Sequence, residues 1–357
     1  MISRREVERQ VISDLRDLAR AGLSAPEVFR QADPMLRDVL GFDAVCWHTT
    51  DPATGLVNSV LTDDLELDDF RQAVQLEIWG DDVARFPEIR LSGRGADTLS
   101  RATGGVLRRS LRYREQIAPA GFGDELRAVF DAGGGMWGCA AFMRAPDRGP
   151  YRAGELVLAQ RAARHLGIAL QRSQLLHSPF TQPPLPPAVV VLGPDNHLLG
   201  ADEQAERLLG EFTDDSGSIF TVPTSFVMVA EQARSAATGI RTPSGLRVRG
   251  RDGRWFVLHA SLLRGKADGP AAVVITPASP ADIMPVVFAS YGLTPSEREV
   301  ALRIVQGRST GDIAQILCTT PLTVQDHLKS IFTKAGVRSR REFVARLLMA
   351  HPPDVWT

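Results

Sequence analysis

The spacing of hydrophobic and polar residues predicts two regions of mixed helix and strand, followed by a third region that is wholly helical. The first region opens with an apolar stripe at helical spacing from Val7 to Leu18, behind a capping box formed by Ser3 and Glu6. The predicted elements are a helix that begins after Ser3, a helix over 25–40, strands over 43–49, 56–61 and 136–144, and a closing helix over 154–176. Helices that flank an antiparallel sheet predict an α+β domain.

The middle region alternates short apolar runs with turn signals. Asp252-Gly253 separates two of these runs and predicts a tight hairpin turn. The predicted strands cover 188–192, 197–199, 246–250, 254–263 and 271–276, and one helix covers 202–209. This pattern predicts a second α+β domain.

Two proline-rich stretches, 178–187 and 277–285, divide the chain. The first is not expected to form a helix or a central strand, because proline removes an amide donor and fixes φ, and the second is a shorter break. We therefore predict a domain over 1–177, a linker over 178–187, a second domain over 188–278 and a C-terminal domain over 286–357.

The C-terminal region carries strong helix-start signals. Thr294 is placed as an N-cap, Pro295 takes the first helical position, Glu297 completes a capping box, and Gly307 ends the helix. Three more helices are predicted: one near 310–317 with Ile313, Ile316 and Leu317 on its inner face, one over 321–335, and one over 339–349. A short helix joined by a four-residue turn to a longer, half-polar helix is typical of a helix-turn-helix.

The third of these helices has one apolar and one polar face. At 100° per residue, Leu328 and Ile331 align with Val324, whereas Gln325, Asp326 and Lys329 project from the other side. Amide, carboxylate and ammonium groups in such a row can bond base edges in the major groove. The alternative is the solvated face of an ordinary bundle helix.

Charge and composition sharpen this picture. Residues 291–350 hold nine basic and five acidic side chains and have a net charge of +4. Because the net charge of the whole chain is −1, the remaining residues have a net charge of −5. A basic tail on an acidic body suggests a polyanion partner for the tail. With 44% hydrophobic residues the chain can fill cores, and no apolar run resembles a membrane span or secretion signal, so we expect a soluble cytoplasmic protein. Cys46, Cys139 and Cys318 form no CxxC pair, which excludes a disulfide framework or zinc finger.

The C-terminal residues resemble the LuxR-type DNA-binding domain over about 291–348. The resemblance is carried by 293–300, 312–314, 321–328, 331–337 and 339–340. It implies an all-α domain of four helices, in which the third reads the major groove and the fourth often supports dimerisation. The family usually has Lys where Gln325 stands, so the operator is expected to differ.

By the same resemblance, Gln325, Asp326 and Lys329 are the expected base readers. Residues expected to contact the DNA backbone are Thr320, Thr323, His327, Lys334 and Arg340. A packed flank residue is the alternative for His327.

The front regions resemble sensor modules. The order of elements in the first region is similar to a GAF domain, and 190–210 resembles the opening of a PAS domain: strand, Gly-Pro-Asp turn, strand and helix. The acidic pattern of a phosphoacceptor receiver is absent, and so are a P-loop and the ligand motif of acyl-homoserine-lactone receptors. A small-molecule pocket remains.

Aromatic residues are the candidates for that pocket, with His48 and either Arg112 or Arg114 as anchors for an acidic effector. The candidate effector-binding residues are Trp47, His48, Trp79, Phe86, Phe122, Trp137 and Phe142. The alternative is that these aromatics simply fill the core. Cys46 and Cys139 could approach on neighbouring strands, either as buried inert thiols or as a redox switch.

No GxSxG, HExxH or close carboxylate pair stands out, so an enzyme is not expected, and no cofactor or metal is implied. We predict a homodimeric, effector-controlled transcription regulator whose partners are double-stranded DNA, an unidentified small molecule and, as a further candidate, RNA polymerase. The alternative is a constitutive dimeric DNA-binding protein whose front domains act only as scaffold or protein-interaction modules.

Overall fold

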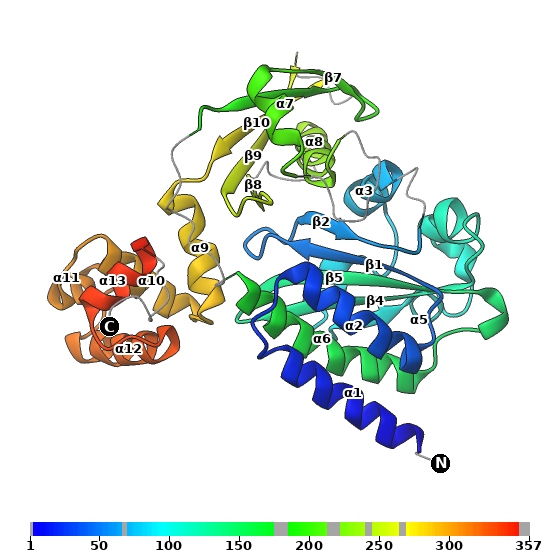
Figure 1. The fold of residues 1–357 in the computed structure, drawn as a ribbon, viewed down its shortest axis with the longest axis horizontal. Helices are drawn as coiled ribbons and strands as arrows, with labels where there is room; N and C mark the ends of the chain where they lie inside the picture. Colours follow the sequence, from blue (N-terminus) through cyan, green and yellow to red (C-terminus); the bar gives the residue numbers. More distant parts are fainter. Residues whose placement is uncertain are drawn as a thin grey trace.

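The computed structural model describes residues 3–65, 70–174, 185–212, 222–239, 245–263 and 269–349. Two sheet-bearing regions are followed by a helical C-terminal region (Figure 1), so the multidomain combination of α+β and all-α parts is confirmed. Most of the expected linker lies outside the described residues, and the domain boundaries stay a prediction. Within the described ranges, no helix is both long and apolar enough to cross a bilayer.

The first region is built on an antiparallel sheet with the strand order β2-β1-β5-β4-β3. Its main elements are α1 (Arg4–Leu18), α2 (Ala25–Leu40), β1 (Ala44–Thr50), β2 (Val57–Leu61), α3 (Phe70–Trp79), α4 (Phe86–Leu91), β3 (Ala96–Thr98), α5 (Leu99–Ala102), β4 (Asp124–Ala132), β5 (Gly135–Arg144) and α6 (Ala153–Ser173). Helices α1, α2 and α6 cover one face of this sheet (Figure 1). The capping box of Ser3 and Glu6 is present, as the sequence predicts.

The middle region contains a second antiparallel sheet, β7-β6-β10-β9-β8. Its elements are β6 (Ala188–Leu192), β7 (Leu198–Ala201), α7 (Glu203–Leu209), α8 (Thr224–Ala237), β8 (Leu246–Arg249), β9 (Trp255–Leu262) and β10 (Ala271–Pro277). Numbered from its own first strand, this sheet has the same strand order as the first. The predicted hairpin joins β8 to β9, and Gly253 adopts φ 84° in its turn.

The C-terminal region comprises α9 (Pro280–Ser290), α10 (Pro295–Val305), α11 (Thr310–Ile316), α12 (Pro321–Ala335) and α13 (Arg340–Met349). Helix α9 corrects the prediction of a break over 277–285. Ser279 and Asp282 form a capping box and Pro280 takes the first helical position, where proline is tolerated because that amide has no partner within the helix. Pro285 lies inside the helix without ending it.

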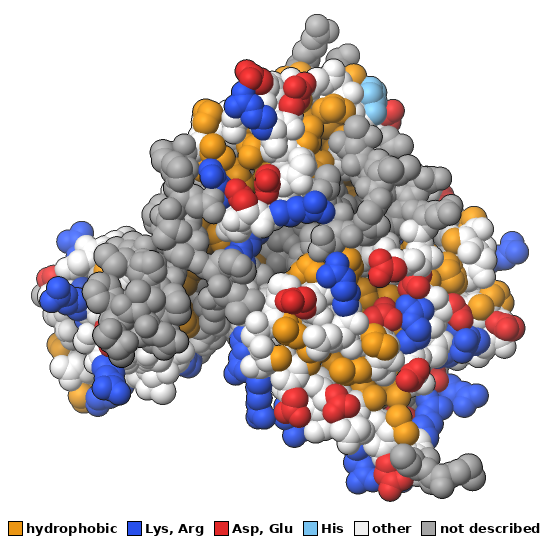
Figure 2. All heavy atoms as spheres, viewed as in Figure 1, with side chains coloured by type: hydrophobic (Ala, Val, Ile, Leu, Met, Phe, Trp, Pro, Cys, Tyr) orange, Lys and Arg blue, Asp and Glu red, His pale blue; other side chains and the backbone are white. Residues whose placement is uncertain are grey.

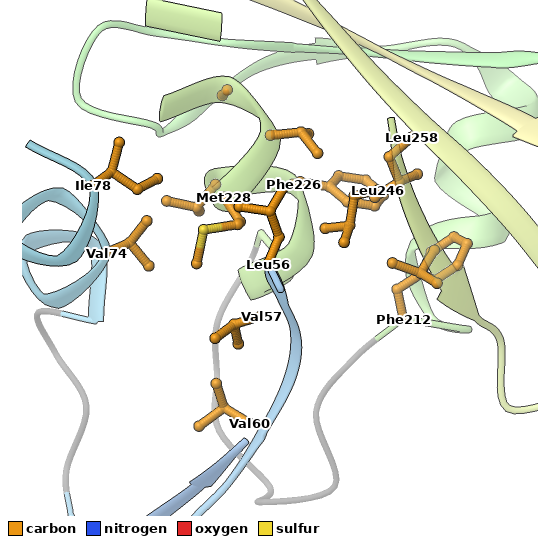
Figure 3. Packing of buried hydrophobic residues seen from close by; sticks show 14 of the residues in the cluster. Leu56, Val57, Val60, Val74, Ile78, Phe212, Phe226, Met228, Leu246 and Leu258 are labelled. Atoms are coloured by element: carbon orange, nitrogen blue, oxygen red, sulfur yellow. The ribbon is translucent and has the colours of Figure 1, made fainter. Parts of the chain in front are cut away.

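A single hydrophobic cluster joins the two sheets (Figure 3). Leu56, just before β2, and Val57 and Val60 on β2 join Val74 and Ile78 of α3 in this cluster. They pack against α8 and β8 of the middle region through Phe226, Met228 and Leu246. None of these residues is more than 7% exposed. The two front regions therefore share one core.

Polar contacts reinforce this junction. The Asp51 carboxylate, fully buried after β1, accepts from the Arg247 backbone amide at 3.1 Å and from Arg247 Nη1 at 2.9 Å. On α8, the buried Glu231 accepts from Trp79 Nε1 at 2.7 Å and pairs with Arg234 at 2.9 Å. Helix α3 is thereby held to α8 as well as to its own sheet.

Candidate nucleic-acid interface and ligand cavity

Helix α12 begins and ends where its sequence dictates. The Thr320 hydroxyl accepts from the Thr323 amide at 3.1 Å, Pro321 takes the first helical position, and Gly336 ends the helix in the left-handed conformation with φ 64°. Val324 and Ile331 are fully buried against α10, α11 and α13, so the predicted inner face is confirmed.

The turn before α12 sets the angle between the two helices of the motif. Cys318 adopts φ 50°, and the Thr319 amide donates to the Ala314 carbonyl at 2.9 Å. Ile313 is fully buried, but Ile316 is 45% exposed, which corrects its predicted place on the inner face. The turn thus follows a helix that packs mainly through Ile313 and Ala314.

The three expected base readers lie together on the exposed side of α12. Gln325, Asp326 and Lys329 are all exposed, and Lys329 Nζ lies 3.6 Å from Asp326 Oδ1. Thr320 and Thr323 are exposed at the start of the same helix, and His327 is half-buried at its flank. Figure 2 shows basic side chains on the outer edge of this helical region, at the left of the view.

Two of the expected backbone contacts are engaged within the protein. Lys334 Nζ donates to Glu297 Oε2 at 2.6 Å, and Ser330 donates to the other oxygen of the same carboxylate at 2.6 Å. Arg340 donates to the carbonyls of Ile304 and Arg308 at the end of α10. Lys334 and Arg340 therefore brace the helices that present α12.

Glu297 is a residue whose wider role the sequence did not reveal. The capping box with Thr294 is as predicted, but the same carboxylate also ties α10 to α12. Although burial opposes ionisation, hydrogen bonds from Lys334, Ser330 and Thr294 lower the pKa of Glu297 to about 2. The carboxylate is therefore ionised at neutral pH.

The helical region also contacts the first region. Arg298 Nη2 donates to the Gly133 carbonyl in the β4–β5 turn at 2.8 Å, and Gln171 on α6 donates to the Ala289 carbonyl on α9 at 2.6 Å. The orientation of α12 is thus tied to the front of the chain through α9 and α10.

A cavity of about 360 Å³ lies on the side of the first sheet opposite α1, α2 and α6. His48, Phe86 and Phe122 line it, as predicted, together with apolar residues of β5, α3 and the 113–120 segment. Met228 reaches it from α8 of the middle region. Its lining is apolar with a few charged groups on one wall, as in small-molecule sites.

The two arginines on that wall are neutralised by carboxylates. Arg112 contacts Glu125 at 2.8 Å and Asp82 at 3.5 Å, and Arg127 contacts Glu125 at 3.1 Å and Glu77 at 2.7 Å. Because Arg112 already forms ion pairs with protein carboxylates, it does not offer an unpaired positive charge to the expected acidic effector.

Four predicted effector residues, Trp47, Trp79, Trp137 and Phe142, do not line this cavity. Trp47 on β1 faces α2 and α6, opposite His48, because successive side chains on a strand point to opposite faces. Trp137 and Phe142 on β5 belong to the same core as Trp47. This corrects their assignment to one pocket with His48. Trp79 is turned toward Glu231, and Arg114 is exposed and donates to the Arg108 carbonyl at 2.6 Å.

His48 and the two buried cysteines share the cavity side of the sheet. Burial and the Arg127 charge lower the pKa of His48 to about 3, so its ring is neutral at physiological pH. Cys139 is opposite His48 in the β1–β5 pairing, Cys46 lies two residue pairs further along, and neither cysteine forms a disulfide. Burial raises the pKa of the Cys139 thiol well above its usual range, which favours the inert alternative over a redox switch.

Metal ligation finds no support among the residues that the structure describes, since no group of three or more His, Cys, Asp or Glu side chains converges there.

Residues 292–347 match the family described as bacterial regulatory proteins of the luxR family. A helix-turn-helix transcriptional regulator of Mycobacterium bovis is 44% identical over 52 residues, which are 15% of this chain and 6% of that protein. GfsR of Streptomyces halstedii, named as a regulator of the same type, is 40% identical over 63 residues, 18% of this chain and 26% of GfsR. The C-terminal helical domain is therefore of the LuxR type, and the chain spans only a small part of the length of these relatives.

Among solved structures, SdiA of Escherichia coli aligns over 93% of this chain and 92% of its own, with 14% identity and a TM-score of 0.33. The phycoerythrobilin-bound GAF domain of a cyanobacterial phytochrome aligns over 50% of this chain and 98% of its own, with 18% identity and a TM-score of 0.32. Both scores are too low to assign the front regions.

Proposed function

We propose that the chain is a sequence-specific, DNA-binding transcription regulator that acts as a homodimer and responds to a small molecule bound in its first region. The observation that carries the proposal is the exposed row of Gln325, Asp326 and Lys329 on α12, within a segment of the LuxR type. This row can enter the major groove because nothing among the described residues covers it, whereas the apolar face of α12 is fully packed.

The proposed base readers are Gln325, Asp326 and Lys329. Thr320, Thr323 and His327 would approach the phosphates from the start and flank of α12. Lys334 would act mainly through Glu297, and Arg340 through the end of α10, because both side chains are already bonded there.

The effector site we propose is the cavity beside His48, Phe86 and Phe122. Since Arg112 and Arg127 are both paired with carboxylates, the effector that fits is uncharged and largely apolar. Met228 joins this cavity to the middle region, so an occupant would contact both front regions at once. We also propose that the first region is GAF-like and the middle region PAS-like, and that both sense or relay rather than catalyse.

Selection from a random oligonucleotide pool, followed by titration of the selected duplex at several salt concentrations, tests the DNA-binding proposal. Lys329→Ala should weaken specific binding by about 1–3 kcal/mol if the ammonium group contacts a base. If it contacts phosphate alone, the loss should be uniform across sequences and the salt slope should fall by about one. Arg5→Ala, which removes one exposed positive charge on α1, is the matched control.

Equal affinity of Lys329→Ala and the wild type at every salt concentration would refute the proposed interface. A homodimer further requires that the selected site be a near-palindrome with half-sites about one helical turn, roughly 34 Å, apart. A selected site without that symmetry would contradict binding as a homodimer.

Effector binding is tested by native mass spectrometry of protein purified from its own host, using two variants of the 113–120 segment. Ala120 lines the cavity and Ala118 does not, and both are exposed. Ala120→Trp should abolish a retained small molecule, whereas Ala118→Trp should keep it. A retained molecule that survives in both variants would place the effector elsewhere, and a ligand-independent operator affinity would favour the scaffold alternative.

A further inference from the structure

A second cavity lies between the two sheets, apart from the effector cavity. Its volume is about 370 Å³, and its lining comes from both front regions: the start of α2, the β1–β2 hairpin, and the β8–β9 hairpin. Its apolar lining includes Phe29, Val60 and Trp255. The cavity therefore sits where a bound molecule would touch both sheets.

Arg249, on β8, is half-buried and lines this cavity, and no carboxylate among the described residues forms an ion pair with it. Arg112, Arg127 and Arg234 each contact a carboxylate within 3.5 Å. Arg249 Nε donates to the Gly253 carbonyl at 3.3 Å, and its guanidinium carbon lies 5.9 Å from the centre of the Trp255 ring. Arg249 Nη2 is buried without an acceptor among the described residues. Burial lowers the pKa of the Arg249 guanidinium with no opposing charge, yet arginine stays protonated at neutral pH.

The neighbouring charges do not neutralise this arginine. Asp51 also lines the cavity, but it is committed to Arg247, two residues before Arg249 on the same strand. Glu211 accepts from the Asp252 amide at 3.0 Å. A partly desolvated cation without a carboxylate beside it is unfavourable, and an anion that enters the cavity would reduce that penalty.

We propose that this cavity is a second ligand site, which takes a small organic monoanion whose carboxylate pairs with Arg249 and whose apolar part lies against Phe29, Val60 and Trp255. A single unpaired guanidinium matches one negative charge, and its planar N–H groups match a carboxylate. An apolar body suits the rest of the lining. Because residues of both sheets enclose it, the ligand would fasten the first region to the middle region.

The test uses benzoate as the probe and uncharged benzamide as its near-isosteric control. The full-length protein is titrated by calorimetry and thermal unfolding, with sodium chloride holding the ionic strength constant. Benzoate should bind and raise the unfolding temperature with increasing concentration, and benzamide should do neither. Inorganic phosphate should bind more weakly than benzoate, because it carries more negative charge and has no apolar group to pack against the lining.

Arg249→Met should weaken benzoate binding at least tenfold, because a hydrogen-bonded charge pair is lost. Without ligand, the same variant should unfold at the wild-type temperature or above it, since an uncompensated buried cation has been removed. Arg249→Lys should retain partial binding. Arg254→Gln is the control, because Arg254 lies on the same hairpin, pairs with Asp252 at 2.8 Å and does not line the cavity.

Benzamide binding equal to benzoate, unaltered benzoate binding in Arg249→Met, or tighter binding of phosphate would each overturn the proposal. So would a marked loss of stability in Arg249→Met without ligand, which would make the arginine structural. The site is independent of the proposed effector cavity, and Ala120→Trp should leave benzoate binding unchanged.

Discussion

Replacing Glu297 by Gln is expected to loosen α12 from α10 without altering the shape of the side chain. The Glu297 carboxylate is 4% exposed and accepts from Lys334 at 2.6 Å, from Ser330 at 2.6 Å and from the Thr294 amide at 2.7 Å. A shift of its pKa from 4.5 to about 2 corresponds to roughly 3 kcal/mol at about 1.36 kcal/mol per pH unit. Gln retains some of these hydrogen bonds, so we expect a loss of about 2 kcal/mol at pH 7.

Hydrogen–deuterium exchange of the full-length protein, read by mass spectrometry on peptides from 294–337, measures this loss locally. In these peptides, a loss of about 2 kcal/mol should make amide exchange through local opening roughly 30 times faster. Peptides from α6 should be unchanged. Glu299→Gln, on the same helix but 56% exposed in its side chain, should change exchange by less than about twofold because its pair with Arg303 is a surface contact.

The pH dependence gives a second check on the same reasoning. Because the folded-state pKa of Glu297 lies below the unfolded value, its contribution is complete above about pH 4.5 and is lost as the pH falls toward 2. The difference in unfolding temperature between wild type and Glu297→Gln should therefore shrink between pH 5 and pH 3. A difference that is absent at pH 7, or that stays constant down to pH 3, would refute the assigned role.

Three further predictions concern the front of the chain. Asp51→Asn should cost about 3 kcal/mol in urea unfolding, because Arg247, 19% exposed in its side chain, loses the carboxylate that neutralises it. Asp51→Asn with Arg247→Met should recover most of that loss, and no recovery would contradict the ion-pair argument. Gly167→Ala should cost at least about 1–3 kcal/mol, because its Cβ would lie 2.6 Å from the Asp131 carbonyl oxygen, whereas Gly154→Ala meets nothing and should be neutral or stabilising by thermal unfolding. The free energy of unfolding should fall by about 2 kcal/mol between pH 7 and pH 5 through His48, since the folded ring stays neutral with a pKa of about 3 while the unfolded ring takes a proton near pH 6.5; His48→Gln should remove that part of the slope.

The parts of the fold that sequence reasoning predicted are those with regular periodicity and local end signals. Helices α2 and α12 have caps at one or both ends and a clear apolar stripe, and their predicted bounds match the structure. Strand β4 was missed because Glu125 and Arg127 interrupt its apolar run, and only the structure shows that these charges are buried as pairs. Helix α8 was missed because it is buried on nearly all sides and shows no polar stripe.

The candidate sites also differ in how far they depend on local sequence and how far on tertiary packing. The outer face of α12 depends only on helical geometry, so Gln325 and Lys329 were predictable. The cavity depends on which strand faces which layer, and alternation along β1 already separates Trp47 from His48. The role of Arg249 was not predictable, because it arises from the absence of a partner in three dimensions.

The cluster shared by β2, α3, α8 and β8 has a consequence for how such a chain can be divided or recombined. A fragment that ends before Ala188 would leave Leu56, Val57 and Val60 facing water, together with the inner side of α3. Such a fragment is expected to self-associate through its exposed apolar surface. The two sheets are therefore expected to be transferable only together, and α9 with them, because its Ile283, Val286 and Ala289 lie in the hydrophobic cluster of the first region.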